Sequence, residues 1–107
     1  MQIQVNTDKN IPGREGLAQH VESILSKELA RFATQVTRLE VHLSDENGAK
    51  SGTADKRCLL EARLAGREPA AVTGAATSVE LAVTGAAKKM VSLLDSELGK
   101  LSKRHIQ

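Results

Sequence analysis

Three histidines and one cysteine are the residues of this chain whose types best suit catalysis or metal binding. His20, His42 and His105 lie far apart in the sequence, and none has a second ligand at the spacing of a zinc motif. Cys58 is the single cysteine, so it cannot form an intramolecular disulfide. Its place in the apolar register of an alternating segment predicts a buried, inert thiol rather than a nucleophile. These residues therefore indicate neither an enzyme nor a metalloprotein.

Acidic residues flank a long polar segment and raise the question of a site for a hard cation. Asp45, Glu46 and Asp55 offer carboxylates, but they lack the spacing and the terminal glutamate of a calcium-binding loop. A solvated loop is the simpler interpretation. The chain also has no glycine-rich phosphate loop and no serine elbow. We therefore expect no catalytic residue, no cofactor, no metal site and no small-molecule substrate.

Basic residues are the third chemical feature, and their distribution says more than the net charge of +2. The positive excess lies in residues 79–107, which hold five basic and three acidic side chains. Several lysines on one helix surface suit RNA, because each neutralised phosphate releases counterions. A solvated helix face with lysines near its C-terminus fits the same pattern, so both interpretations stay open. The polar side of this predicted helix carries Lys88, Lys89, Ser92, Asp95, Ser96 and Lys103.

The segment from Arg38 to Leu64 organises the predicted fold. It consists of RLEVHL, a polar loop SDENGAKSGTAD, and KRCLLEARL. Apolar and charged residues alternate in both flanking runs, which is typical of strands with one buried and one wet face. A β-hairpin is therefore expected, and amphipathic helices must cover its buried face.

The periods of the apolar residues predict the other elements. Steps of three and four define two helical stripes, and the segment TSVE, with Thr77 and Glu80, fits a capping box at the start of the second. The expected strands are 1–7, 38–45, 56–65 and 70–77, and the expected helices are 14–33 and 78–102. The order β-α-β-β-β-α predicts an α+β fold with a four-stranded, mostly antiparallel sheet and two helices packed on one face. The first strand should pair in parallel with residues 38–43.

Composition bounds the class of protein. A chain of 107 residues with 40% hydrophobic and 26% charged residues predicts one globular domain spanning 1–107. No apolar run approaches the 18 residues of a membrane span, and the N-terminus does not look like a secretory signal. A lone cysteine favours a reducing cytoplasm. Phe32 is the single aromatic residue, so the chain lacks a platform for stacking bases.

Two segments give the chain a resemblance to a known family. QHV in the first predicted helix and VHLSDENG…DKRCLLEARLAG in the hairpin resemble the hibernation-promoting factor and ribosome-associated inhibitor family. The resemblance covers essentially the full chain and is closest to the short members. It implies a double-stranded-RNA-binding-domain-like fold. It also implies binding to 16S rRNA of the small ribosomal subunit, in the mRNA and tRNA channel, and inhibition of translation in stationary phase or stress. Off the ribosome, a monomer is expected.

The resemblance also implies which side chains bind RNA, namely basic ones on both helices. Between Leu94 and Leu101 the relatives are rich in Lys, Arg and His, whereas this chain has Asp95 and Glu97. The affinity for RNA is therefore expected to differ from that of the relatives. The alternative function is a protein-interaction module that uses the exposed sheet face, with Leu59, and the 44–55 loop. The implied RNA-binding residues are Lys27, Arg31, Lys88, Lys89, Lys100, Lys103 and Arg104.

Overall fold

The computed structural model describes residues 1–8, 11, 16–45 and 55–106, with side chains described as far as Leu98. Its elements follow the predicted order β-α-β-β-β-α. A short 3-10 turn, η1, separates the first helix from the second strand. The elements are β1 (Gln2–Thr7), α1 (Leu17–Glu28), η1 (Ala30–Phe32), β2 (Val36–Asp45), β3 (Lys56–Leu64), β4 (Ala70–Ala76) and α2 (Val79–Ile106).

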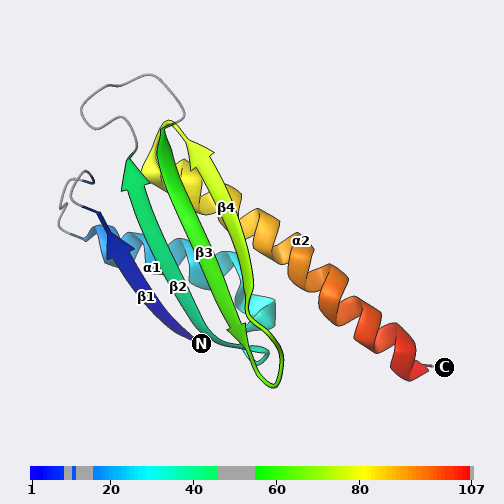
Figure 1. Cartoon of the computed structure of the whole chain (residues 1–107). Helices are drawn as coiled ribbons and strands as arrows, with labels where there is room; N and C mark the ends of the chain where they lie inside the picture. Colours follow the sequence, from blue (N-terminus) through cyan, green and yellow to red (C-terminus); the bar gives the residue numbers. More distant parts are fainter. Residues whose placement is uncertain (9–10, 12–15, 46–54, 107) are drawn as a thin grey trace.

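The sheet has the strand order β1-β2-β3-β4. β1 pairs in parallel with β2, as expected for strands joined by a helix, and the other two pairings are antiparallel. Both helices lie on the same face of the sheet, and α2 extends well beyond it (Figure 1). The predicted α+β class and the packing of both helices on one face are therefore confirmed.

The core lies between this sheet face and the two helices. The alternation in β2 and β3 is confirmed, because Leu39, Val41 and Leu60 are fully buried while their neighbours on each strand are not. Leu25 of α1 and Met90 of α2 are fully buried against them. Each such side chain contributes about 1.5–3 kcal/mol through burial. The apolar stripes therefore set which faces meet.

A glycine in β4 lets α2 approach the sheet closely. A Cβ atom on Gly74 would lie 2.5 Å from the carbonyl oxygen of Ala82 and 2.8 Å from the nitrogen of Ala86. Both are backbone atoms of α2 and cannot move aside without shifting the helix. Gly74, a residue type that is unfavourable within a strand, is therefore a packing requirement of the helix–sheet contact.

Three elements, the two helices and β2, have boundaries that differ from the prediction by two residues or more. The helix expected over 14–33 begins at Leu17, after Gly16 with φ of 81°, and ends at Glu28. β2 starts at Val36 rather than Arg38. A register shift in its pairing with β3 lies between these two residues, so the alternation of apolar residues does not extend back to the true start of the strand. α2 reaches Ile106, beyond the expected residue 102. Residues 14 and 15 lie outside the described part of the chain.

The start of α2 was also predicted with the wrong capping residue. The helix begins at Val79, so Ser78 rather than Thr77 occupies the N-cap position. The backbone N–H of Leu81 donates to Ser78 Oγ at 3.2 Å. That bond satisfies one of the backbone donors exposed at a helix start. In the described residues, neither helix is long and apolar enough to cross a bilayer.

Candidate nucleic-acid interface

The two helices run side by side in the same direction, so polar residues of both helices lie next to one another on one outer surface. His20 Nε2 of α1 lies 4.0 Å from Glu80 Oε2, near the start of α2. Further along, Arg31 of η1 pairs with Asp95 of α2. We call the outward side of this helix pair the helix surface; among the described side chains it comprises Lys27, Arg31, Lys88 and Asp95, with Lys89 at its border with β4.

Lys27 and Lys88 are the cations of the helix surface whose side chains have neither an ion pair nor a hydrogen bond within the described part of the chain. Lys27 lies in the last turn of α1, and Lys88 lies in the middle of the described part of α2. Both side chains are exposed. Free ammonium groups on a stable helix can contact RNA phosphates without first breaking an ion pair. These two lysines fit the prediction of exposed cations on both helices.

Lys89 is exposed, but its side chain reaches towards the sheet rather than away from it. Its Nζ donates a hydrogen bond of 2.8 Å to the carbonyl oxygen of Thr73 in β4. β4 is an edge strand, so its outer backbone groups have no neighbouring strand. Lys89 therefore satisfies part of this edge, and its charge lies at the border between α2 and the sheet.

Asp95 and Glu97, the acidic residues that depart from the family pattern, both form ion pairs. Asp95 pairs with Arg31, whose guanidinium also lies 4.8 Å from the centre of the Phe32 ring. Glu97 Oε2 lies 3.7 Å from Arg67 Nη2, in the turn between β3 and β4. The acidic residues thus neutralise two arginines, one of which was expected to bind RNA.

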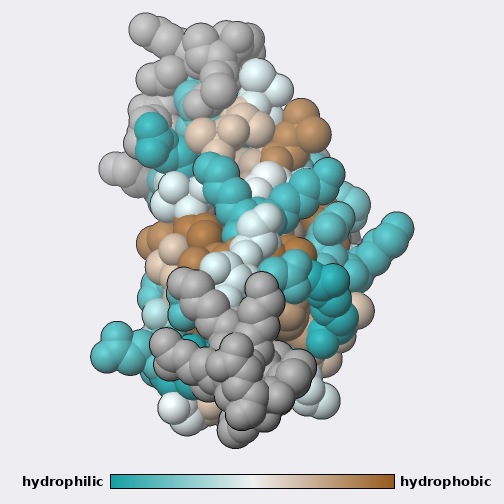
Figure 2. All heavy atoms as spheres, turned by 90° about the vertical axis from the view of Figure 1, so that its right-hand side faces the viewer, coloured by the Kyte–Doolittle hydropathy of each residue, from teal (hydrophilic) through white to brown (hydrophobic). Residues whose placement is uncertain are grey.

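The C-terminal cations belong to the same helix but lie outside the described side chains. The backbone of α2 is helical through Lys100, Lys103 and Arg104. Figure 2 looks onto the side of the molecule where α2 ends. It shows hydrophilic side chains reaching outward around smaller apolar areas.

The sheet face away from the helices, which we call the open sheet face, carries charges that largely pair with one another. Arg38 Nη2 lies 3.1 Å from Glu40 Oε1 on β2. His42 lies between Glu40 and Glu61. Leu59 interrupts these polar residues and is 37% exposed. Because its charges pair internally, this face offers fewer free cations than the helix surface.

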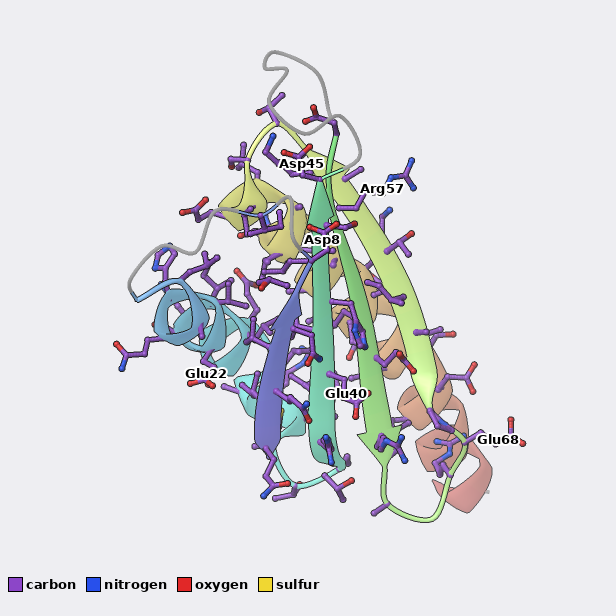
Figure 3. All side chains as sticks on the ribbon, turned by 60° about the vertical axis from the view of Figure 1, so that its left-hand side comes forward. Asp8, Glu22, Glu40, Asp45, Arg57 and Glu68 are labelled. Carbon is purple, nitrogen blue, oxygen red and sulfur yellow. The ribbon has the colours of Figure 1, made fainter. Side chains whose placement is uncertain are left out.

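The two acids at the ends of the polar loop bind a lysine in this structure. Lys56 Nζ lies 3.1 Å from Asp45 Oδ2 and 3.2 Å from Asp55 Oδ1. Both carboxylates are buried, at 3% and 4% exposure, and Asp45 is labelled in Figure 3. The hydrogen bond to Asp45 raises the pKa of Lys56 above its ordinary value, against the opposing effect of desolvation. The third acid considered for a cation site, Glu46, lies outside the described residues, as does the loop 46–54.

The thiol of Cys58 is buried as predicted. Burial raises its pKa to about 12. Since the thiolate is the nucleophilic and metal-binding form, this environment keeps the sulfur unreactive near neutral pH.

Comparison with solved structures finds neighbours that share this fold, among them the following two. One is the N-terminal domain of Protein Y from Thermus thermophilus, with a TM-score of 0.68 and 16% identity over 90% of this chain and 98% of that chain. The other is a ribosomal subunit interface protein from Coxiella burnetii, with a TM-score of 0.70 and 13% identity over 92% of this chain and 99% of that chain. This chain has the Protein Y fold. No family model and no curated protein matches its sequence.

Sequence reasoning missed the cluster at the centre of the open sheet face. Within the Protein Y fold, pairing of β2 with β3 sets Glu40 opposite Glu61, and His42 lies two residues further along β2. The three side chains offer ligand atoms within 4.8 Å of one another. A search for ligands close in sequence overlooks such a group, because its members come together only through the strand register.

Proposed function

We propose that this protein is a ribosome-associated factor of the hibernation-promoting type. Three features support the proposal. The fold is that of Protein Y and of a ribosomal subunit interface protein, the hairpin and first helix resemble that family, and free cations lie on both helices. The observation that carries it is that Lys27 and Lys88, on adjacent helices of this fold, are exposed and have no partner among the described side chains.

In this proposal the helix surface binds 16S rRNA of the small subunit in the mRNA and tRNA channel. Lys27 and Lys88 contact the phosphate backbone, Lys89 joins them when it releases the carbonyl oxygen of Thr73, and the C-terminal cations of α2 extend the contact. Phosphate contacts position a protein without reading sequence, which suits a chain that lacks a base-stacking platform. By occupying the channel, the bound protein inhibits translation in stationary phase or stress. It acts in the cytoplasm as a single, non-enzymatic domain spanning 1–107.

Arg31 joins this contact only when its pair with Asp95 opens. Both partners are more than half exposed, so the pair is worth at most about 1 kcal/mol. A phosphate oxygen could therefore replace the carboxylate at a modest cost. The proposal thus makes Asp95 a competitor of RNA for Arg31, and affinity is lower than in relatives with a basic residue there.

A protein-interaction module remains the second candidate because of Leu59. This side chain is one of three large apolar residues exposed in the described part of the chain, and it lies in the middle of the open sheet face. An apolar contact around Leu59 would resist salt, whereas a phosphate contact weakens steeply with it.

The test is co-sedimentation of the protein with purified small subunits over a salt series. For the parent protein, we expect the logarithm of the binding constant to fall linearly with the logarithm of salt concentration. Lys88→Glu combined with Lys89→Glu should weaken binding at least about tenfold and lower the salt slope by about 2. Translation assays with the same proteins should lose inhibition in parallel.

The matched control compares two single charge reversals on opposite sides of the molecule. Lys88→Glu and Arg63→Glu each change the charge by two units, and both parent side chains are exposed. The first should weaken binding more than the second, while thermal melts of both stay close to the parent. Equal effects would mean that net charge alone, and not the helix surface, drives binding.

A further inference from the structure

Two glutamates and a histidine form a compact group on the open sheet face, which we call the Glu–His–Glu cluster. His42 Nε2 lies 3.5 Å from Glu61 Oε1 and 3.8 Å from Glu40 Oε2. The side chains of Glu40 and Glu61 are 21% and 38% exposed, so the group lies at the surface and is partly covered by neighbouring side chains. Figure 3 labels Glu40 on β2.

The strands that carry this cluster hold it in place. Glu40 and His42 alternate on β2, so both side chains project from the same face. Glu61 lies directly opposite Glu40 on β3. β2 and β3 are the two inner strands of the sheet, so hydrogen-bonded neighbours fix both backbones on either side. The three ligand types are therefore preorganised on rigid elements, which favours ion binding.

Glu40 and Glu61 lie opposite each other on neighbouring strands, and a cation between their carboxylates would reduce the repulsion. Like charges directly opposite each other on neighbouring strands are destabilising. Arg38 contacts Glu40 through Oε1 and also contacts Gln4 of β1, so it balances only the outer side of the pair. The position between Glu40 Oε2 and Glu61 Oε1 is the one that His42 Nε2 faces. Either a proton on this imidazole or a metal ion can compensate the two negative charges there.

We propose that the Glu–His–Glu cluster binds a divalent transition-metal ion of the Zn²⁺ class. His42 Nε2 and one carboxylate oxygen each from Glu40 and Glu61 are the ligands. Imidazole with carboxylates suits zinc, cobalt and nickel, whereas Mg²⁺ and Ca²⁺ take oxygen ligands in larger number. With metal–ligand distances near 2.1 Å, tetrahedral zinc places its ligand atoms about 3.4 Å apart. Two of the three separations already approach that value.

Three protein ligands on an open surface leave one coordination position facing outward, for water or for a group of a partner molecule. The ion would also cross-link β2 to β3. Arg38 and Arg63, which lie one step along the face, oppose a cation and make the expected affinity moderate. Cys58 does not compete as a ligand, because its thiol is buried and protonated. This site is independent of the proposed RNA contact, since it lies on the opposite side of the sheet.

The experiment is a titration of the full chain with Zn²⁺ by calorimetry and with Co²⁺ by visible absorption. We expect one ion per chain, cobalt d–d bands without a sulfur charge-transfer band, and displacement of cobalt by zinc. Zinc should raise the melting temperature of the parent protein. His42→Ala and Glu61→Gln should each weaken binding at least about tenfold, since ligands matter at least as much as the groups that orient them.

The matched control is His20→Ala, which removes another exposed histidine that lies beside a glutamate but outside the cluster. It should bind zinc as the parent does. Glu61→Gln keeps the shape of the side chain, so it tests the site even if His42→Ala folds poorly. The proposal is overturned if the parent binds no zinc or cobalt, or if His42→Ala and Glu61→Gln bind as tightly as the parent.

Discussion

The helix surface and the open sheet face carry similar numbers of charged residues but organise them differently. On the sheet, rigid strands hold the charges in register, and Arg38, Glu40, His42 and Glu61 form one connected group. On the helix surface, Lys27 and Lys88 stay unpaired among the described side chains, while Arg31 pairs with Asp95. Charge count alone therefore does not mark a polyanion-binding surface. Free cations are the better guide, and among the described side chains Lys27 and Lys88 on the helices are free, which is why we propose the RNA contact there.

The largest expected effect concerns the core that carries both surfaces. Leu25→Ala beneath the helix surface and Leu60→Ala beneath the open sheet face should each cost about 2–5 kcal/mol of the free energy of unfolding, because both side chains are fully buried. Denaturant unfolding measures both. A loss below about 1 kcal/mol for either would show that the two surfaces do not share one tightly packed core.

The contact between helix and sheet can be tested with two glycines that differ in their surroundings. Gly74→Ala places a methyl group against the backbone of α2 and should cost about 1–3 kcal/mol. Gly85 on α2 has nothing within 4 Å of the added Cβ, so Gly85→Ala should stabilise by up to about 1 kcal/mol through helix propensity. Thermal or denaturant melts that gave both substitutions the same sign would contradict this description of the interface.

The ion pair between Arg31 and Asp95 tests whether a cation of the helix surface binds RNA better once its acidic partner is removed. Asp95→Asn keeps the shape of the side chain and releases Arg31, so small-subunit binding should tighten by up to about fivefold. Asp95→Lys with Glu97→Lys should tighten it further. Glu68→Gln removes one negative charge from an exposed residue in the turn between β3 and β4, which does not pair with Arg31, and serves as the control. Co-sedimentation at fixed salt would contradict the account if Asp95→Asn bound no better than this control.

The smallest expected effect concerns the thiol beneath the open sheet face. Burial raises the pKa of Cys58 to about 12, so the native protein should react slowly with an alkylating reagent at pH 8. Because the folded-state pKa lies above the unfolded value, the thiol contributes stability at lower pH. That contribution is lost as pH rises from about 9 towards 12. Mass spectrometry with and without denaturant checks the reactivity, and rapid native labelling would show that this strand opens.

Sequence reasoning predicted the features that depend on short-range periodicity. The change of apolar period from two to 3.6 gave the element order, the single covered face and the burial of Leu25 and Leu60. It did not give the contact at Gly74, the pair between Arg31 and Asp95, or the role of Lys56 between two acids. Each of these joins residues of different elements, so it depends on the crossing of a helix and the register of strands.

The candidate sites show the same division. The exposed cations on the helices follow from position along a helical stripe. However, the direction of Lys89 depends on the free edge of β4, which no pattern in α2 reveals. The Glu–His–Glu cluster could have been found by pairing the two segments around the polar loop, since Glu40 and Glu61 are register partners. Alternation within each segment was not enough.

The central claim is that the helix surface, and not the open sheet face, contacts the small subunit. Site-specific photocrosslinking tests it most directly, with a photoreactive amino acid placed at Lys27 or Lys88 and, for comparison, at Leu59. All three side chains are exposed, so each probe can reach a bound partner. We predict that the two helix positions crosslink to 16S rRNA and that Leu59 does not. Crosslinks to the ribosome from Leu59, with none from the helix positions, would contradict the account and identify the sheet face as the contact.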